Sequence, residues 1–219
     1  MPVRKIPKSY RSVTGYFPSI KNGRSIAYES KLERDFFLML EFDRAVVGYE
    51  EQPFHILGTF DGKKFKYTPD CLVSYAAGQP LLIAEVKFLK ELEEKADEFR
   101  PKFDRAEDYA RQNGMEFRVF TESDIRGDFL DNCKILYGFA RPPGNLVDHA
   151  ERIRMTAVNA GEIEFGRLLE ILSSDKMTRA VIMPVVWHLI FRGDLVIADM
   201  YKPINNNSIL RTANGNTHS

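Results

Sequence analysis

Hydrophobic and polar positions along the first half of the chain follow two different periods. Over residues 29–42 the apolar side chains recur every three or four positions, which predicts an amphipathic helix. Short apolar runs then predict strands at 54–60, 63–67, 70–75, 81–87 and 117–120. The pair Asp61-Gly62 between the first two runs predicts a β-hairpin. A charged helical stretch covers 90–113, and we expect Pro101 to break it.

From about residue 124 the pattern becomes mostly helical, with three or four helices and a short strand pair. We therefore predict an α/β fold in three parts: a basic N-terminal arm over 1–28, a mixed α/β domain over 29–124 and a helical domain over 125–219. The proline-rich segment Arg141–Gly144 is a competing boundary, or a loop between two helices.

Composition and charge exclude several classes of protein. Lys and Arg total 31 and Asp and Glu total 31, so a bulk polybasic nucleic-acid binder is excluded, although residues 1–28 carry six basic residues and no acid. Two cysteines and four histidines without a cluster exclude a zinc finger, an iron–sulfur site and a disulfide scaffold. No apolar run reaches the ~18 residues of a membrane span. The basic N-terminus lacks an apolar segment, so we expect no secretory signal.

Several carboxylates occupy positions that the pattern does not predict to be exposed to solvent. Glu29 and Glu33 fall within the apolar face of the helix predicted at 29–42, where a carboxylate is costly unless it is paired or binds a metal. The alternative is that one of them lies at the rim beside a Lys or Arg. Asp70 follows a proline at the start of a strand. Glu85 and Lys87 lie on one face of the strand at 81–87, although a frayed strand end with solvated charges is also common.

The combination is more specific than its parts. Pro-Asp at 69–70, fourteen intervening residues and then Glu85-x-Lys87 resemble the PD-(D/E)xK nuclease superfamily. The resemblance implies that Asp70 and Glu85 meet on adjacent strands and share a hard cation, Mg²⁺, through oxygen ligands. It also implies Glu33 as a third carboxylate.

Beside these carboxylates, the carbonyl of Val86 would be a further metal ligand. Lys87 would assist the attacking water or steady the phosphate. One or two Mg²⁺ ions are expected, with Mn²⁺ as a substitute.

Four segments extend the resemblance to one family. Residues 29–37, 46–53, 67–70 and 84–87 resemble the TnsA family, the endonuclease subunits of heteromeric bacterial transposases. Ser30-x-x-Glu33 matches the first catalytic Glu of that family, and residues 116–122 resemble its closing strand. Residues 20–125 resemble the family well. Residues 125–219 match its winged-helix C-terminal domain in length and helical content. The chain departs from the best-known family pattern at Glu85, where that pattern has Gln, and Glu29 has no clear counterpart.

The resemblance implies a fold and a function. The fold would be a restriction-endonuclease-like mixed sheet flanked by helices, followed by a winged-helix-like domain. The function would be Mg²⁺-dependent cleavage at the 5′ ends of a transposon during cut-and-paste transposition, in the bacterial cytoplasm. Glu33, Asp70, Glu85 and Lys87 would be catalytic. The implied partners are double-stranded DNA at the transposon ends, an integrase-type (TnsB-like) transposase subunit and an AAA+ ATPase regulator (TnsC-like).

Two other functions stay open from the residues. One is a restriction or repair endonuclease of the same superfamily, and the other is a non-catalytic transposition adaptor. A carboxylate cluster argues against the adaptor, since a fold without activity has no physical need for it. We expect His55 to be structural and Cys71 to be buried and inert. For the apolar helix-like run at 180–192, with arginines only near its ends, we favour protein docking over base reading.

Overall fold

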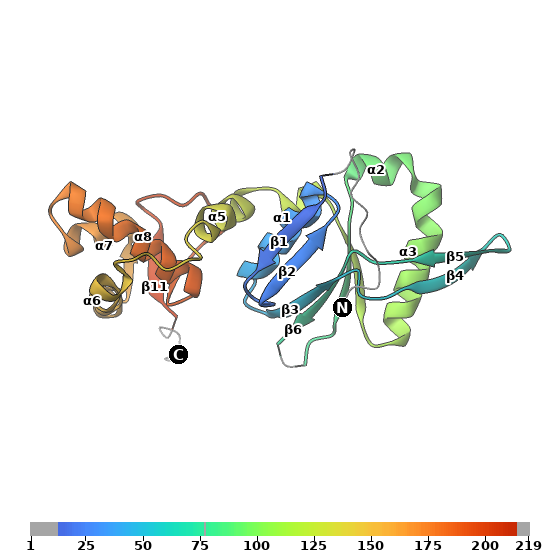
Figure 1. Cartoon of the computed structure of the whole chain (residues 1–219), viewed down its shortest axis with the longest axis horizontal. Helices are drawn as coiled ribbons and strands as arrows, with labels where there is room; N and C mark the ends of the chain where they lie inside the picture. Colours follow the sequence, from blue (N-terminus) through green and yellow to red (C-terminus); the bar gives the residue numbers. More distant parts are fainter. Residues whose placement is uncertain (1–12, 77, 214–219) are drawn as a thin grey trace. The chain divides into compact units, whose positions relative to one another are not determined.

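The computed structural model of the chain describes residues 13–76 and 78–213. They form two compact units that divide between Arg126 and Gly127 (Figure 1). The Arg141–Gly144 segment lies within the second unit, between two of its helices. None of the helices in the described part of the chain is both long and apolar enough to cross a membrane.

The first unit begins with a hairpin of β1 (Gly15–Ser19) and β2 (Arg24–Tyr28). Phe17 pairs with Ile26 across it, and both side chains are buried. The arm predicted over 1–28 is therefore wrong for residues 15–28, because this pair buries apolar area that an arm would leave in water. Residues 1–12, which hold most of the basic side chains of the predicted arm, lie outside the described residues.

Helix α1 (Lys31–Phe42) begins two residues later than predicted. Ser30 is its N-cap and accepts a hydrogen bond from the backbone N–H of Glu33 at 3.1 Å. The predicted apolar face is confirmed, since its side chains are buried: Leu32, Phe36, Phe37 and Leu40.

Four strands form the central sheet: β3 (Val46–Glu51), β6 (Cys71–Tyr75), β7 (Leu82–Val86) and β8 (Glu116–Phe120), in the order β3-β6-β7-β8. The first two pairs are antiparallel and β7–β8 is parallel, so the sheet is mixed. The ring of Phe36 from α1 contacts Phe120, and the ring of Phe103 from α3 contacts Phe117. Because Phe117 and Phe120 point to opposite faces of β8, helices cover both faces of the sheet and every residue of β7 is buried.

The hairpin predicted around Asp61-Gly62 is confirmed as β4 (Ile56–Phe60) paired with β5 (Lys63–Tyr67). Both turn residues have positive φ, 49° at Asp61 and 74° at Gly62, as a two-residue hairpin turn requires. The hairpin crosses α3 (Figure 1) and is held there by a cluster of Ile56, Tyr67 and Ala106.

The charged stretch after β7 forms α2 (Leu89–Glu94) and α3 (Ala96–Gln112), and the expected break at Pro101 is wrong. The chain breaks at Lys95, and Pro101 lies inside α3. Helix α2 buries no side chain, whereas α3 buries Phe99, Ala106 and Ala110. A break before α3 lets this apolar stripe face the sheet and hairpin while α2 stays at the surface. The unit ends with α4 (Glu122–Ile125), capped by Thr121.

The second unit holds four helices and a small antiparallel sheet among its described residues. The helices are α5 (Asp128–Tyr137), α6 (Leu146–Ala160), α7 (Phe165–Leu172) and α8 (Lys176–Arg192). The strands β9 (Glu162–Glu164), β10 (Leu195–Ile197) and β11 (Ile209–Thr212) pair in the order β10-β11-β9. Trp187 of α8 stacks on Phe165, with ring centroids 4.3 Å apart.

Candidate active site

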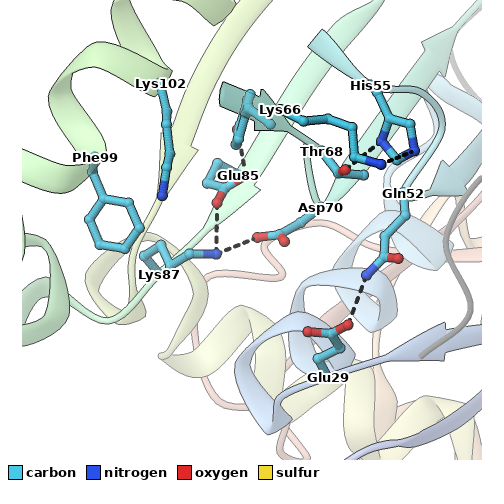
Figure 2. Close-up of a pocket in the computed structure, with 11 residues that line it drawn as sticks. Glu29, Gln52, His55, Lys66, Thr68, Asp70, Glu85, Lys87, Phe99 and Lys102 are labelled. Carbon is cyan, nitrogen blue, oxygen red and sulfur yellow. Dashed lines mark hydrogen bonds and ion pairs between the residues drawn. The ribbon is translucent and has the colours of Figure 1, made fainter. Parts of the chain in front are cut away.

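A pocket of about 480 Å³ lies where β6 begins and β7 ends. Asp70 immediately precedes β6, and Lys87 immediately follows β7. The two strands are antiparallel with Cys71 opposite Ala84, so the same register places Asp70 opposite Glu85. The sequence prediction that these two carboxylates meet on adjacent strands is therefore consistent with the sheet, and both line the pocket together with Lys87 (Figure 2).

One ammonium group joins the two carboxylates. Lys87 Nζ lies 2.9 Å from Asp70 Oδ2 and 2.7 Å from Glu85 Oε1 (Figure 2). Because both oxygens contact the same nitrogen, Asp70 Oδ2 and Glu85 Oε1 lie close to each other. All three side chains are largely buried, so the ion pairs are little screened by solvent.

The surroundings hold both carboxylates in place. The backbone N–H of Val86 donates to Asp70 Oδ2 at 2.8 Å, and the hydroxyl of Tyr67 donates to Glu85 Oε2 at 2.6 Å. The carbonyl of Val86, the predicted backbone ligand, lies 3.2 Å from Lys87 Nζ. Each carboxylate therefore has one fixed orientation, set by a strand backbone or a buried phenol.

Glu33 is held differently. Its Oε2 accepts a hydrogen bond from the backbone N–H of Glu29 at 2.8 Å, while its own N–H donates to Ser30. The bond to Ser30 caps α1, and the bond from Glu29 ties the Glu33 side chain to the residue before the cap, so the Ser-x-x-Glu pattern serves the start of a helix. Glu29 accepts from the side-chain amide of Gln52 at 3.1 Å at the edge of the pocket (Figure 2).

The donors present suit a hard divalent cation. They are carboxylate and carbonyl oxygens, which Mg²⁺ prefers, and the position between Asp70 and Glu85 already accommodates a positive charge. Within the described residues, however, no three acidic, histidine or cysteine side chains are grouped closely enough to hold one ion together. A cation bound between Asp70 and Glu85 would have to displace the Lys87 ammonium.

A comparison with protein families finds a match over the segment that surrounds this pocket. Residues 43–122 match the family model described as the TnsA-like endonuclease N-terminal domain. This segment of the chain is therefore similar to a TnsA-like endonuclease domain. The match confirms the resemblance to the TnsA family, and it spans Asp70, Glu85 and Lys87, whereas Glu33 precedes it. A search among curated proteins finds no match.

Two carboxyl groups, Glu85 in the pocket and Glu33 on α1, have unusual proton affinities. Burial, and secondly the charge of Asp70, raise the pKa of Glu33 to about 8 and that of Glu85 to about 7. Burial disfavours the charged form of Lys87. The negative charges of Asp70 and Glu85 outweigh this effect, so the pKa of the Lys87 ammonium group is raised. The site therefore keeps Lys87 charged, and its crowded carboxylates favour added positive charge or a proton.

The raised pKa of Glu33 predicts how stability depends on pH in the presence of a chelator. Between its ordinary pKa of 4.5 and about 8, the folded chain keeps a proton on Glu33 that the unfolded chain releases. The free energy of unfolding should therefore fall as pH rises, by up to about 1 kcal/mol per pH unit for this group. Urea unfolding at a series of pH values measures this slope.

Glu33→Gln should make that slope shallower, because Gln can still accept from the backbone N–H of Glu29 but does not titrate. Glu107→Gln, a change of an exposed carboxylate on α3, should leave the slope unchanged. A slope that is equal in the wild type and in Glu33→Gln would contradict the assignment of the raised pKa to Glu33.

Sequence reasoning missed one side of the pocket. His55, Lys66 and Thr68 line it, although we expected His55 to be only structural. His55 Nδ1 lies 2.7 Å from Thr68 Oγ1, and Lys66 Nζ lies 3.3 Å from His55 Nε2 (Figure 2). The available signal was the two-residue period that places these residues on one face of the hairpin. Cys71 is buried, and burial raises the pKa of its thiol, as expected for an unreactive cysteine.

Proposed function

We propose that the chain is a Mg²⁺-dependent DNA endonuclease subunit of a heteromeric transposase, which cuts the 5′ ends of the transposon during cut-and-paste transposition. The observation that carries the proposal is the meeting of Asp70, Glu85 and Lys87 in one pocket of a TnsA-like endonuclease domain. The family match supports a nuclease related to the Tn7 type of transposase. Metal dependence, strand choice and partners belong to the proposal.

The residues divide the work by their chemistry. Asp70 and Glu85, with the Val86 carbonyl, would hold one or two Mg²⁺ ions, and Glu33, which is not among the residues that line the pocket, would join them as the third carboxylate. Bound Mg²⁺ would polarise the phosphodiester and lower the pKa of water. Val86 N–H and the Tyr67 hydroxyl orient the two carboxylates. Lys87, charged and close to both, would stabilise the negative charge that develops on the phosphate oxygens or orient the attacking water.

The second unit would serve assembly. We propose that it is winged-helix-like, supported by its helices and three-stranded antiparallel sheet. On α8, Met177 and Val181 are exposed apolar residues, 76% and 55% accessible. Such exposed side chains suit docking to a transposase or ATPase subunit better than reading of DNA bases, which requires polar and basic groups.

The products of transposition test this function. If the chain cuts the 5′ ends, a transposon with the wild-type protein gives simple insertions. A variant without nuclease activity should give cointegrates, because the element stays joined to its donor DNA through the uncut strands. Sequencing of the insertion products separates the two outcomes. Simple insertions from Asp70→Asn would refute the 5′-cutting role, and cutting that ignores the transposon ends would favour a restriction or repair nuclease.

A further inference from the structure

One face of the β4–β5 hairpin leads directly into the pocket. Residues of alternating strand positions share a face, and the register pairs Leu57 with Lys66 and Thr59 with Lys64. Extending the same alternation adds His55 and Thr68 at the hairpin base, beside Asp70. We call these six residues the outer face of the hairpin: His55, Leu57, Thr59, Lys64, Lys66 and Thr68.

The opposite face of the hairpin packs against the protein. Ile56 and Tyr67 are buried there with Ala106 of α3, and Phe65 packs against this cluster. Gly58 lies under the ring of Phe65, where an added Cβ would come within 2.2 Å of Phe65 Cζ. Arg105 of α3 also donates to the carbonyl of Leu57 at 3.0 Å. The register of the hairpin is thereby fixed, so the outer face stays turned away from α3.

The outer face is cationic and has no acidic residue. Within the described residues, no carboxylate lies at ion-pair distance from Lys64 or Lys66. The ammonium group of Lys66 instead contacts His55 Nε2. Because an ammonium group only donates, His55 Nε2 must accept this hydrogen bond, and Nδ1 of the same ring donates to Thr68. By contrast, Lys102, also at the pocket, pairs with Glu98 at 2.6 Å. The outer face therefore carries uncompensated positive charge beside a pocket lined by carboxylates.

We propose that the outer face of the hairpin binds the phosphate backbone of double-stranded DNA next to the bond that is cut. The proposal rests on the proposed function and names the surface through which that site holds its substrate. The carboxylates of the pocket would repel a polyanion, so DNA needs cationic contacts beside them. Lys64 and Lys66 supply positive charge for the phosphates, and His55 and Thr68 lie closer to the pocket. The hairpin is a two-stranded ribbon, which is narrow enough to enter the major groove of DNA.

Adjacent lysines of the hairpin provide a matched test. Lys64→Gln and Lys63→Gln remove the same charge from exposed neighbouring positions, but Lys63 pairs with Phe60 on the opposite face. Binding of the full chain to a fluorescein-labelled random-sequence DNA duplex is followed by anisotropy over a series of salt concentrations. We expect Lys64→Gln and Lys66→Gln each to weaken binding and to lower the salt slope of log K by ~1, as loss of one phosphate contact does. Lys63→Gln should leave both unchanged.

Several outcomes would overturn the proposal. The first is an equal effect of Lys63→Gln and Lys64→Gln on binding. The second is a wild-type salt slope in both Lys64→Gln and Lys66→Gln. The third is that the wild-type chain does not bind the duplex at low salt. Displacement by polyglutamate as effective as by unlabelled duplex would indicate an acidic protein partner instead. A chain whose binding depends on Lys64 but which cuts no DNA together with its partners would refute the proposed function and leave the DNA-binding face standing.

Discussion

Replacement of Asp70 by asparagine is expected to abolish DNA cleavage and to weaken divalent-cation binding by at least ~100-fold. Changes in residues that only support metal ligands already cost about 10–100-fold, so the loss of a ligand charge should cost more. The fold should persist, because Asn keeps an acceptor for the N–H of Val86 and Lys87 keeps its pair with Glu85. The change also removes the negative charge that helps to raise the pKa of Glu33 and Glu85.

The matched control for this variant is Asp104→Asn, the same change at an exposed position of α3. Calorimetric titration with Mn²⁺ measures binding, and circular dichroism verifies that each variant is folded. Asp104→Asn should bind the cation and cut DNA as the wild type does. A folded Asp70→Asn protein that retains wild-type Mn²⁺ affinity or still cuts DNA would remove Asp70 from the site.

Replacement of Lys87 by glutamine should separate chemistry from metal binding. We expect cleavage to fall by ~10²–10³-fold, the usual cost of removing one group that stabilises charge developing in the transition state. Cation binding should be retained or become tighter, because the Lys87 ammonium contacts the same oxygens of Asp70 and Glu85 that would bind the metal. This opposite effect on the two measurements distinguishes Lys87 from Asp70.

Lys90→Gln, at an exposed position of α2, is the control for Lys87→Gln and should change neither measurement. The chemistry is measured as cleavage in the assembled transposase complex, and cation binding is measured by Mn²⁺ titration of the full chain. Undiminished 5′-strand cleavage by Lys87→Gln would show that the lysine has no part in the chemistry. A loss of cation affinity as large as that of Asp70→Asn would assign it a purely structural role in holding the carboxylates.

The pairing that forms the pocket could be predicted because it depends on local signals. Pro69 fixes where β6 starts, and the apolar run before Glu85 fixes β7. The turn at Asp61-Gly62 fixes the β4–β5 hairpin, which leads into Pro69 and β6. Together these signals bring Asp70 opposite Glu85 without knowledge of the tertiary structure.

Features that depend on tertiary packing could not be predicted in the same way. The break at Lys95 has no glycine or proline to mark it, and beyond it α3 buries Phe99, whose ring stacks on that of Phe103. The bond from Glu33 to the Glu29 N–H depends on where α1 starts, two residues after the predicted position. His55 and Lys66 reach the pocket only because the inner face of the hairpin is anchored to α3.

The measurement that tests the central claim most directly is strand mapping of cleavage by the assembled complex. End-labelled transposon DNA is incubated with the full chain, the transposase subunit and the ATPase, with either Mg²⁺ or a chelator. We predict cuts at the 5′ ends of the transposon with the wild-type chain and Mg²⁺, and none with the chelator or with Asp70→Asn. The same 5′ cuts in the presence of the chelator, or with folded Asp70→Asn, would contradict a metal-dependent endonuclease centred on Asp70, Glu85 and Lys87.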